Sequence, residues 1–126
     1  MATVLVVDDD RLTVQALTVL LQNSKHTVLP AIAGPQALTW LESVRPDVVL
    51  LDLNMPGLDG FGLLWNLSQD ARTRAMPIVI LTGQPEALEG RKIPPNVVEV
   101  LRKPQEPDDI LKAIEKAIHG PLPSRS

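Results

Sequence analysis

Four short apolar runs of this sequence are each followed by residues that could do chemistry. In chain order, these residues are Asp8, Asp9 and Asp10, then Asp52, then Thr82, and finally Lys103. Carboxylates that are forced together repel one another, and they recruit a cation where one is available. Because this set offers several carboxylates and no soft ligand, it favours Mg²⁺, which takes oxygen ligands and keeps several waters.

The same residues would suit the transfer of a phosphoryl group. A carboxylate that a metal ion neutralises can act as a nucleophile toward phosphorus, and phosphoryl transfer mainly needs positioning and charge neutralisation. Lys103 would offer a second positive charge to the phosphoryl oxygens, and Thr82 would donate a hydroxyl hydrogen bond to one of them. The sequence therefore contains candidates for a metal site, a nucleophile, a hydroxyl donor and a cation.

A parallel sheet would bring these positions together. Apolar runs predict five strands, at Thr3–Val7, 26–32, Asp47–Asp52, Pro77–Leu81 and Val97–Leu101. Helical spacing predicts helices after Asp10, after Gly34, after Asp59 or Gly60, and from Pro107 to Gly120. Apolar strands that alternate with helices are typical of a parallel α/β sheet covered on both faces, whose ligands bind at the carboxyl ends of the strands. Pro30 indicates that the second strand is an edge strand or has a bulge.

The segment between the fourth and fifth predicted strands breaks the alternation. It contains two glycines and three prolines: Gly83, Pro85, Gly90, Pro94 and Pro95. A helix could form only over about Glu86–Lys92, which is roughly two turns and marginal by the cooperativity of helix formation. We therefore expect this helix to be short or irregular.

Composition excludes several classes of protein. The chain has 126 residues, which suits one domain, and it has no cysteine for a disulfide scaffold, a thiol nucleophile or a Cys-ligated metal. The net charge of −3 and the scarcity of aromatic residues argue against a nucleic-acid binder. No apolar run approaches the roughly 20 residues of a membrane helix, and no signal peptide is evident. We therefore expect a cytoplasmic protein without direct nucleic-acid or membrane contact.

The sequence resembles the receiver domain of two-component response regulators over nearly its whole length. The residues that carry the resemblance are Asp8 and Asp9, Asp52–Gly60 (DLNMPGLDG), Thr82–Gly83 and Lys103–Pro104. The separations of 30 residues from Asp52 to Thr82 and 21 from Thr82 to Lys103 also agree. The resemblance implies a flavodoxin-like, doubly wound five-stranded sheet in order 2-1-3-4-5, with helices on both faces. It further implies a receiver domain over residues 1–120 and a tail or linker end at 121–126.

The resemblance also implies a role for each matching residue. Asp52 is the implied phosphoacceptor, and Thr82 and Lys103 are the implied catalytic residues that act with it. Asp8 and Asp9 match the acidic pair that binds Mg²⁺ with Asp52, and Asn54 matches the position whose backbone carbonyl reaches the metal. A cis peptide bond is expected at Lys103–Pro104.

The function implied is that of a phosphoacceptor rather than of a general enzyme. Such a domain takes a phosphoryl group from a sensor histidine kinase or a phosphotransfer protein, and it catalyses only this step and a slow self-hydrolysis. It then switches binding to an output protein, to an effector in a longer chain or to a second copy. Gln84 and Asn54 would flank the path of the attacking water.

Two departures from the family pattern leave an alternative open. Val100 occupies the strand-five position where the family usually has a tyrosine or phenylalanine, and the proline-rich segment lies where the family has its fourth helix. The alternative is a receiver-like interaction module that keeps the pocket but binds partners mainly without phosphorylation.

Several other polar or aromatic residues have simpler interpretations. We interpret Asp10 as a helix cap, with metal ligation as the alternative. His26 and His119 are expected at the surface, and Trp40 and Trp65 are expected to pack beside helical stripes.

Overall fold

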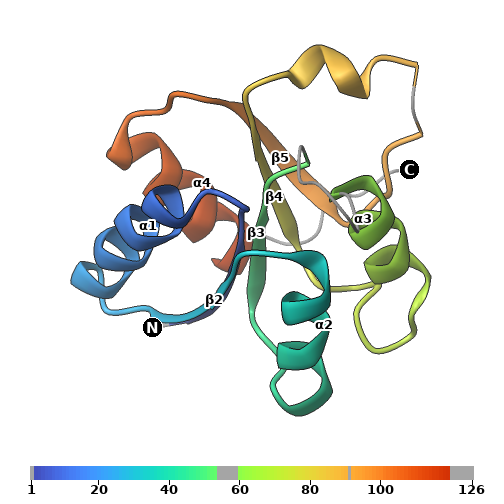
Figure 1. Cartoon of the computed structure of the whole chain (residues 1–126), viewed down its shortest axis with the longest axis horizontal. Coiled ribbons are helices and arrows are strands. Elements are labelled where there is room, and N and C mark those ends of the chain that lie inside the picture. Colours follow the sequence, from blue (N-terminus) through green and yellow to red (C-terminus); the bar gives the residue numbers. More distant parts are fainter. Residues whose placement is uncertain (1, 54–59, 91, 120–126) are drawn as a thin grey trace.

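The described part of this computed structural model covers residues 2–53, 60–90 and 92–119, and a parallel β-sheet organises it (Figure 1). The sheet has five strands in the order β2-β1-β3-β4-β5, and every neighbouring pair is parallel. The strands are β1 (Thr3–Val7), β2 (Thr27–Ala31), β3 (Val48–Leu51), β4 (Ile78–Thr82) and β5 (Val97–Arg102). The predicted flavodoxin-like order is therefore confirmed.

Burial explains why these segments form strands. All residues of β3 and β4 are buried, as expected for central strands covered on both faces. β2 lies at one edge of the described sheet, so only β1 pairs with it. Proline, which lacks a backbone N–H, is tolerated on such an edge strand, and Pro30 is therefore compatible with this position. The observed strands begin or end one residue away from several predicted limits, and Thr82 and Arg102 belong to their strands.

Helices cover both faces of the sheet (Figure 1). α1 (Arg11–Asn23) and α4 (Pro107–His119) pack on one face through a cluster that contains Leu21, Leu50 and Ile114. α2 (Gly34–Ser43) and α3 (Gly60–Gln69) pack on the other through a cluster that contains Leu51, Leu63 and Ile80. The two apolar layers fix the sheet and leave its strand ends to carry polar residues.

The helix in the connection between β4 and β5 is short, as predicted, although it lies at Pro85–Leu88 rather than over about Glu86–Lys92. The connection's only helical element in the described residues is η1 (Pro85–Leu88), a four-residue 3₁₀ turn. Gly90 follows with φ of 75°, a left-handed conformation that glycine adopts without steric cost. On β5, Val100 pairs with Ile80 and its side chain is 40% exposed, so little covers the family's usual aromatic position.

The prediction that His26 lies at the surface was wrong. Its side chain is buried, and Nε2 lies 3.1 Å from Oε1 of Glu115 on α4. His119 is exposed as predicted and contacts the same carboxylate. Trp40 packs against the core and donates its indole N–H to the Pro30 carbonyl, whereas Trp65 is 49% exposed.

The turn between α1 and β2 places a non-glycine residue in the left-handed region. Lys25 has φ of 72°, and the turn is closed by bonds from Lys25 N–H to the Gln22 carbonyl and from His26 N–H to the Leu21 carbonyl. This is the Schellman arrangement, in which the left-handed position is usually glycine. A lysine here therefore has a conformational cost that glycine would avoid.

We expect Lys25→Gly to increase the free energy of unfolding by about 0.5–1 kcal/mol, because relief of the left-handed strain exceeds the entropy that glycine adds to the unfolded chain. Urea unfolding measures this as a higher midpoint with an unchanged slope. Ser24→Gly is the matched control and should be destabilising, since Ser24 has φ of −95° and gains no such relief. A lower midpoint for Lys25→Gly would contradict the prediction.

Candidate functional site

The carboxyl ends of β1, β3, β4 and β5 bring the predicted polar residues to one edge of the sheet. Asp8 and Asp52 directly follow β1 and β3, Thr82 ends β4, and Lys103 directly follows β5. Backbone hydrogen bonds hold these positions. Asp8 N–H donates to the Ala31 carbonyl at 3.1 Å, Asp52 N–H to Val7 at 2.9 Å, and Lys103 N–H to Thr82 at 2.8 Å. The backbone hydrogen bonds thus continue one residue beyond the strands, and they fix the Cα positions of Asp8, Asp52 and Lys103.

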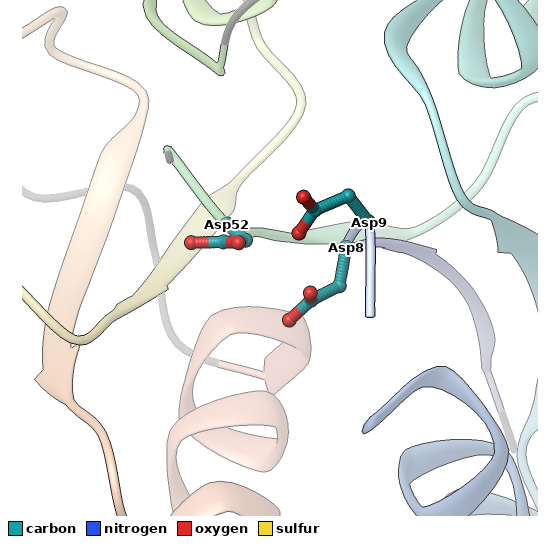
Figure 2. A group of neighbouring side chains, drawn as sticks. All are labelled: Asp8, Asp9 and Asp52. Atoms are coloured by element: carbon teal, nitrogen blue, oxygen red, sulfur yellow. The ribbon is translucent and has the colours of Figure 1, made fainter. Parts of the chain in front are cut away.

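Three of the predicted carboxylates form one cluster. Oxygens of Asp8, Asp9 and Asp52 all lie within 4.8 Å of one another, and Figure 2 shows the side chains converging from the ends of β1 and β3. Asp8 and Asp52 are buried, whereas Asp9 is exposed. Hard oxygen donors at this spacing fit the coordination preferences of Mg²⁺, so the chemistry of the donor set suits the predicted metal.

Lys103 provides the positive charge at this cluster. Its Nζ lies 2.6 Å from Oδ2 of Asp8 and 3.8 Å from Oδ2 of Asp52, with the side chain 28% exposed. The short contact to Asp8 is a charge-assisted hydrogen bond, the stronger kind in proteins. Sequence reasoning assigned Lys103 to a phosphoryl group but did not identify this pairing with Asp8. Among the described residues, three carboxylates here face one ammonium group, so this group of side chains carries an excess of negative charge.

Thr82 is fully buried at the end of β4, on the strand between Asp52 and Lys103. The backbone N–H of Gln84 donates to its Oγ1 at 3.1 Å. This turn restricts the rotamer of the threonine and leaves the Gln84 side chain at the surface. The start of the β4–β5 connection is thereby tied to a predicted site residue.

Asp10 is a helix cap, as interpreted from the sequence. Its side chain accepts hydrogen bonds from Thr13 Oγ1 and from the backbone N–H groups of Leu12 and Thr13. Those bonds, led by the one from the Thr13 hydroxyl, lower the pKa of the Asp10 carboxyl from its ordinary value. The Asp10 N–H in turn donates to Asp8 Oδ1 at 3.0 Å, so both oxygens of Asp8 have partners.

Two further predictions concern the cis peptide bond before Pro104 and the backbone carbonyl of Asn54. The peptide bond between Lys103 and Pro104 is cis, as expected. Asn54, whose backbone carbonyl was expected to reach the metal, lies outside the described residues.

Residues 4–115 match the family described as the response regulator receiver domain. The chain belongs to this family. It is 34% identical over 123 residues to protein PilH of Pseudomonas aeruginosa, covering 95% of this chain and 100% of PilH. It is 41% identical over 90 residues to the response regulator PleD of Caulobacter vibrioides, covering 71% of this chain but only 19% of PleD.

Solved structures agree with this membership. The chemotaxis response regulator CheY4 of Vibrio cholerae superposes with a TM-score of 0.82 and 30% identity, covering 93% of this chain and 98% of that one. Receiver domains are signalling domains of two-component systems.

Across the helices that the structure describes, we find none with the length and apolar character needed to cross a membrane.

We expect Asp9→Asn to stabilise the protein in the absence of divalent cations. Two like charges about 4 Å apart in a water-like dielectric repel by about 1 kcal/mol, and Asp9 is the exposed member of the cluster. Urea unfolding in the presence of a chelator should therefore show a higher midpoint for the variant.

Asp8→Asn is the matched control, because it removes the carboxylate that holds Lys103. It should destabilise the protein by on the order of 2 kcal/mol, since it replaces a buried, charge-assisted hydrogen bond. If Asp9→Asn lowered the midpoint as well, repulsion among the carboxylates would not be the dominant electrostatic effect at this edge.

Proposed function

We propose that this chain accepts a phosphoryl group on Asp52 and switches partner binding in a two-component phosphorelay. The observation that carries the proposal is the cluster of Asp8, Asp9 and Asp52 facing Lys103 at the carboxyl edge of the sheet. Membership of the receiver family supports it independently. The donor would be a phosphohistidine on a sensor histidine kinase or on a phosphotransfer protein.

The reaction needs an Asp52 oxygen in line with the phosphorus atom. A new P–O bond forms to that oxygen while the P–N bond to the donor imidazole breaks, and the imidazole keeps the electron pair. The backbone bond from Asp52 N–H to the Val7 carbonyl fixes the base of the nucleophile against β1. Burial of Asp52 limits the directions from which a donor can approach.

The carboxylates of Asp8, Asp9 and Asp52 would hold Mg²⁺ together with the backbone carbonyl of Asn54. The bound ion would supply charge neutralisation for the transferring phosphoryl group. Asp9, being exposed, is the member of the set that a hydrated ion can reach most easily. Asp8 would contribute while it remains anchored by the Asp10 N–H.

Lys103 and Thr82 would contact the phosphoryl oxygens once the group is on Asp52. Lys103 Nζ is already 3.8 Å from Asp52, so a small movement of a flexible side chain would bring it to the new charge. The Thr82 hydroxyl would donate to a second oxygen, and Gln84 moves with it through the bond to Thr82 Oγ1. These contacts transmit the presence of the phosphoryl group to the start of the β4–β5 connection.

We assign the receiver unit to residues 1–120, with 121–126 as a tail or linker end. Its output would pass to a separate protein, to an effector joined to it in a longer protein, or through a homodimer. Val100 stands where the family usually has an aromatic residue, and η1 stands where it has a full helix. Phosphorylation would therefore change partner binding at β5 and the β4–β5 connection in a different way from the one common in the family. Catalysis would be limited to the chain's own phosphorylation and slow self-hydrolysis.

Incubation with Mg²⁺ and a small phosphodonor such as acetyl phosphate should add the mass of one phosphoryl group. Asp52→Ala should abolish the adduct, because it removes the nucleophilic oxygen. Intact-mass spectrometry measures both results. Asp70→Asn, which alters a carboxylate paired with Arg72 beyond the end of α3, is the matched control and should be phosphorylated normally. If no adduct formed with any donor, the phosphorylation-independent interaction module would replace this proposal.

Mg²⁺ should also stabilise the unphosphorylated protein, because it binds the folded carboxylate cluster and not the unfolded chain. Linkage predicts about 2.7 kcal/mol when free Mg²⁺ is 100 times its dissociation constant. Thermal unfolding with and without Mg²⁺ measures the effect, and Asp9→Asn should remove most of it. An equal Mg²⁺ response in Asp9→Asn would argue against Asp9 as a ligand.

A further inference from the structure

A groove lies between α3 and the segment that leads into β5, on the sheet face opposite α1 and α4 (Figure 1). Its lining residues come from these two elements and are Phe61, Leu64, Trp65, Lys92 and Pro94. None of them is part of the carboxylate cluster or of its hydrogen bonds. The groove is therefore separate from the carboxylate site, and its residues have no part in the proposed phosphoryl transfer.

Two large apolar side chains in or beside the groove are exposed. Trp65 is 49% exposed, and Ile93, next to the lining residue Lys92, is 36% exposed. In the described residues, the β4–β5 connection forms only the four-residue η1, so no α-helix of that connection covers this surface. Tryptophan is one of the residue types enriched at the energetic centres of protein interfaces.

Two of the lining residues, Leu64 and Pro94, are buried and held by their surroundings. Leu64 is buried in the core and fixes the floor to α3. Pro94 is buried, Pro95 follows it, and the Pro94 carbonyl accepts a hydrogen bond from Val97 N–H at 3.1 Å. Because two consecutive prolines restrict the backbone and a turn closes it, little conformational entropy remains to be lost on binding.

Size and charge together indicate the occupant. The volume of about 250 Å³ is below the roughly 300–1,000 Å³ of typical small-molecule sites, and it suits one large side chain. Among the described residues, Lys92 is the only charged residue that lines the groove; it is exposed and forms no ion pair with another residue of the described ranges. An acidic group beside the inserted side chain would complement it.

We propose that this groove binds a peptide segment of a partner protein, in which one large apolar side chain inserts beside Trp65 and a neighbouring acidic residue pairs with Lys92. Both parts of the recognition are needed, since exposed ion pairs alone contribute little. A larger cavity of about 500 Å³ lies between α2 and the end of α3. It would not favour an acidic peptide over a basic one, because both acidic residues, Glu42 and Asp70, and a basic residue, Arg72, line it. The proposal does not depend on phosphorylation of Asp52.

The test uses the indole N–H signals of the two tryptophans in ¹H–¹⁵N NMR spectra, assigned with Trp65→Phe. The probe is a capped pentapeptide with a central phenylalanine flanked by glutamates. Two matched peptides replace the glutamates by lysines or the phenylalanine by alanine. We expect the acidic phenylalanine peptide to shift the Trp65 signal saturably. The signal of Trp40 should stay in place, because its indole is hydrogen-bonded to Pro30. Both matched peptides should bind at least about tenfold more weakly.

Lys92→Glu should weaken binding of the acidic peptide by about threefold to tenfold and strengthen binding of the lysine peptide. The unchanged Trp40 signal would show that the variant is folded, and its phosphoryl uptake should equal that of the parent chain. The proposal would be overturned by an unmoved Trp65 signal at millimolar peptide, by equal responses to the acidic and basic peptides, or by unaltered binding to Lys92→Glu. Failure of phosphorylation with normal peptide binding would count against the proposed function alone.

Discussion

Electrostatic repulsion among three carboxylates at one edge of a parallel sheet is the constraint on which the rest of this structure depends. Asp8, Asp9 and Asp52 lie within 4.8 Å of one another, and Lys103 is the cation that contacts two of them. Such a cluster is unfavourable unless its neighbours hold it firmly and unless further positive charge can reach it. The same unfavourable charge is what would make the edge receptive to a cation and to a phosphoryl group.

The fold resists this repulsion through its backbone and its two apolar layers. The hydrogen-bond ladder extends past β1, β3 and β5, so the residues at the strand ends cannot separate without breaking it. Central strands buried on both faces anchor that ladder, and β3 carries Asp52 at its end. The Asp10 cap directs a fourth carboxylate toward α1 and away from the cluster. The β4–β5 connection beside this edge contains, among the described residues, only η1 as a helical element.

Much of this arrangement could be predicted from the sequence, because apolar runs and the residues that end them are local signals. The positions of the strands and the cap at Asp10 follow from patterns a few residues long, whereas the strand order was implied by the resemblance to the receiver family. The helix expected over about Glu86–Lys92 is short, but it lies at Pro85–Leu88 and is a 3₁₀ turn. Other features depend on distant parts of the chain. The burial of His26 arises from its contact with Glu115, 89 residues away, and the pairing of Lys103 with Asp8 spans 95 residues. The exposure of Trp65 likewise depends on how little the later β4–β5 connection covers.

The most direct test of this account is to locate the phosphorylated carboxylate chemically. Borohydride reduces an acyl phosphate to an alcohol, so a phosphorylated aspartate becomes homoserine and can be found by peptide mass spectrometry. After incubation with Mg²⁺ and acetyl phosphate, the account predicts homoserine at position 52 and at none of the neighbouring aspartates. Homoserine at position 8 or 9, or unreduced aspartate throughout a chain that carries the phosphoryl mass, would contradict it.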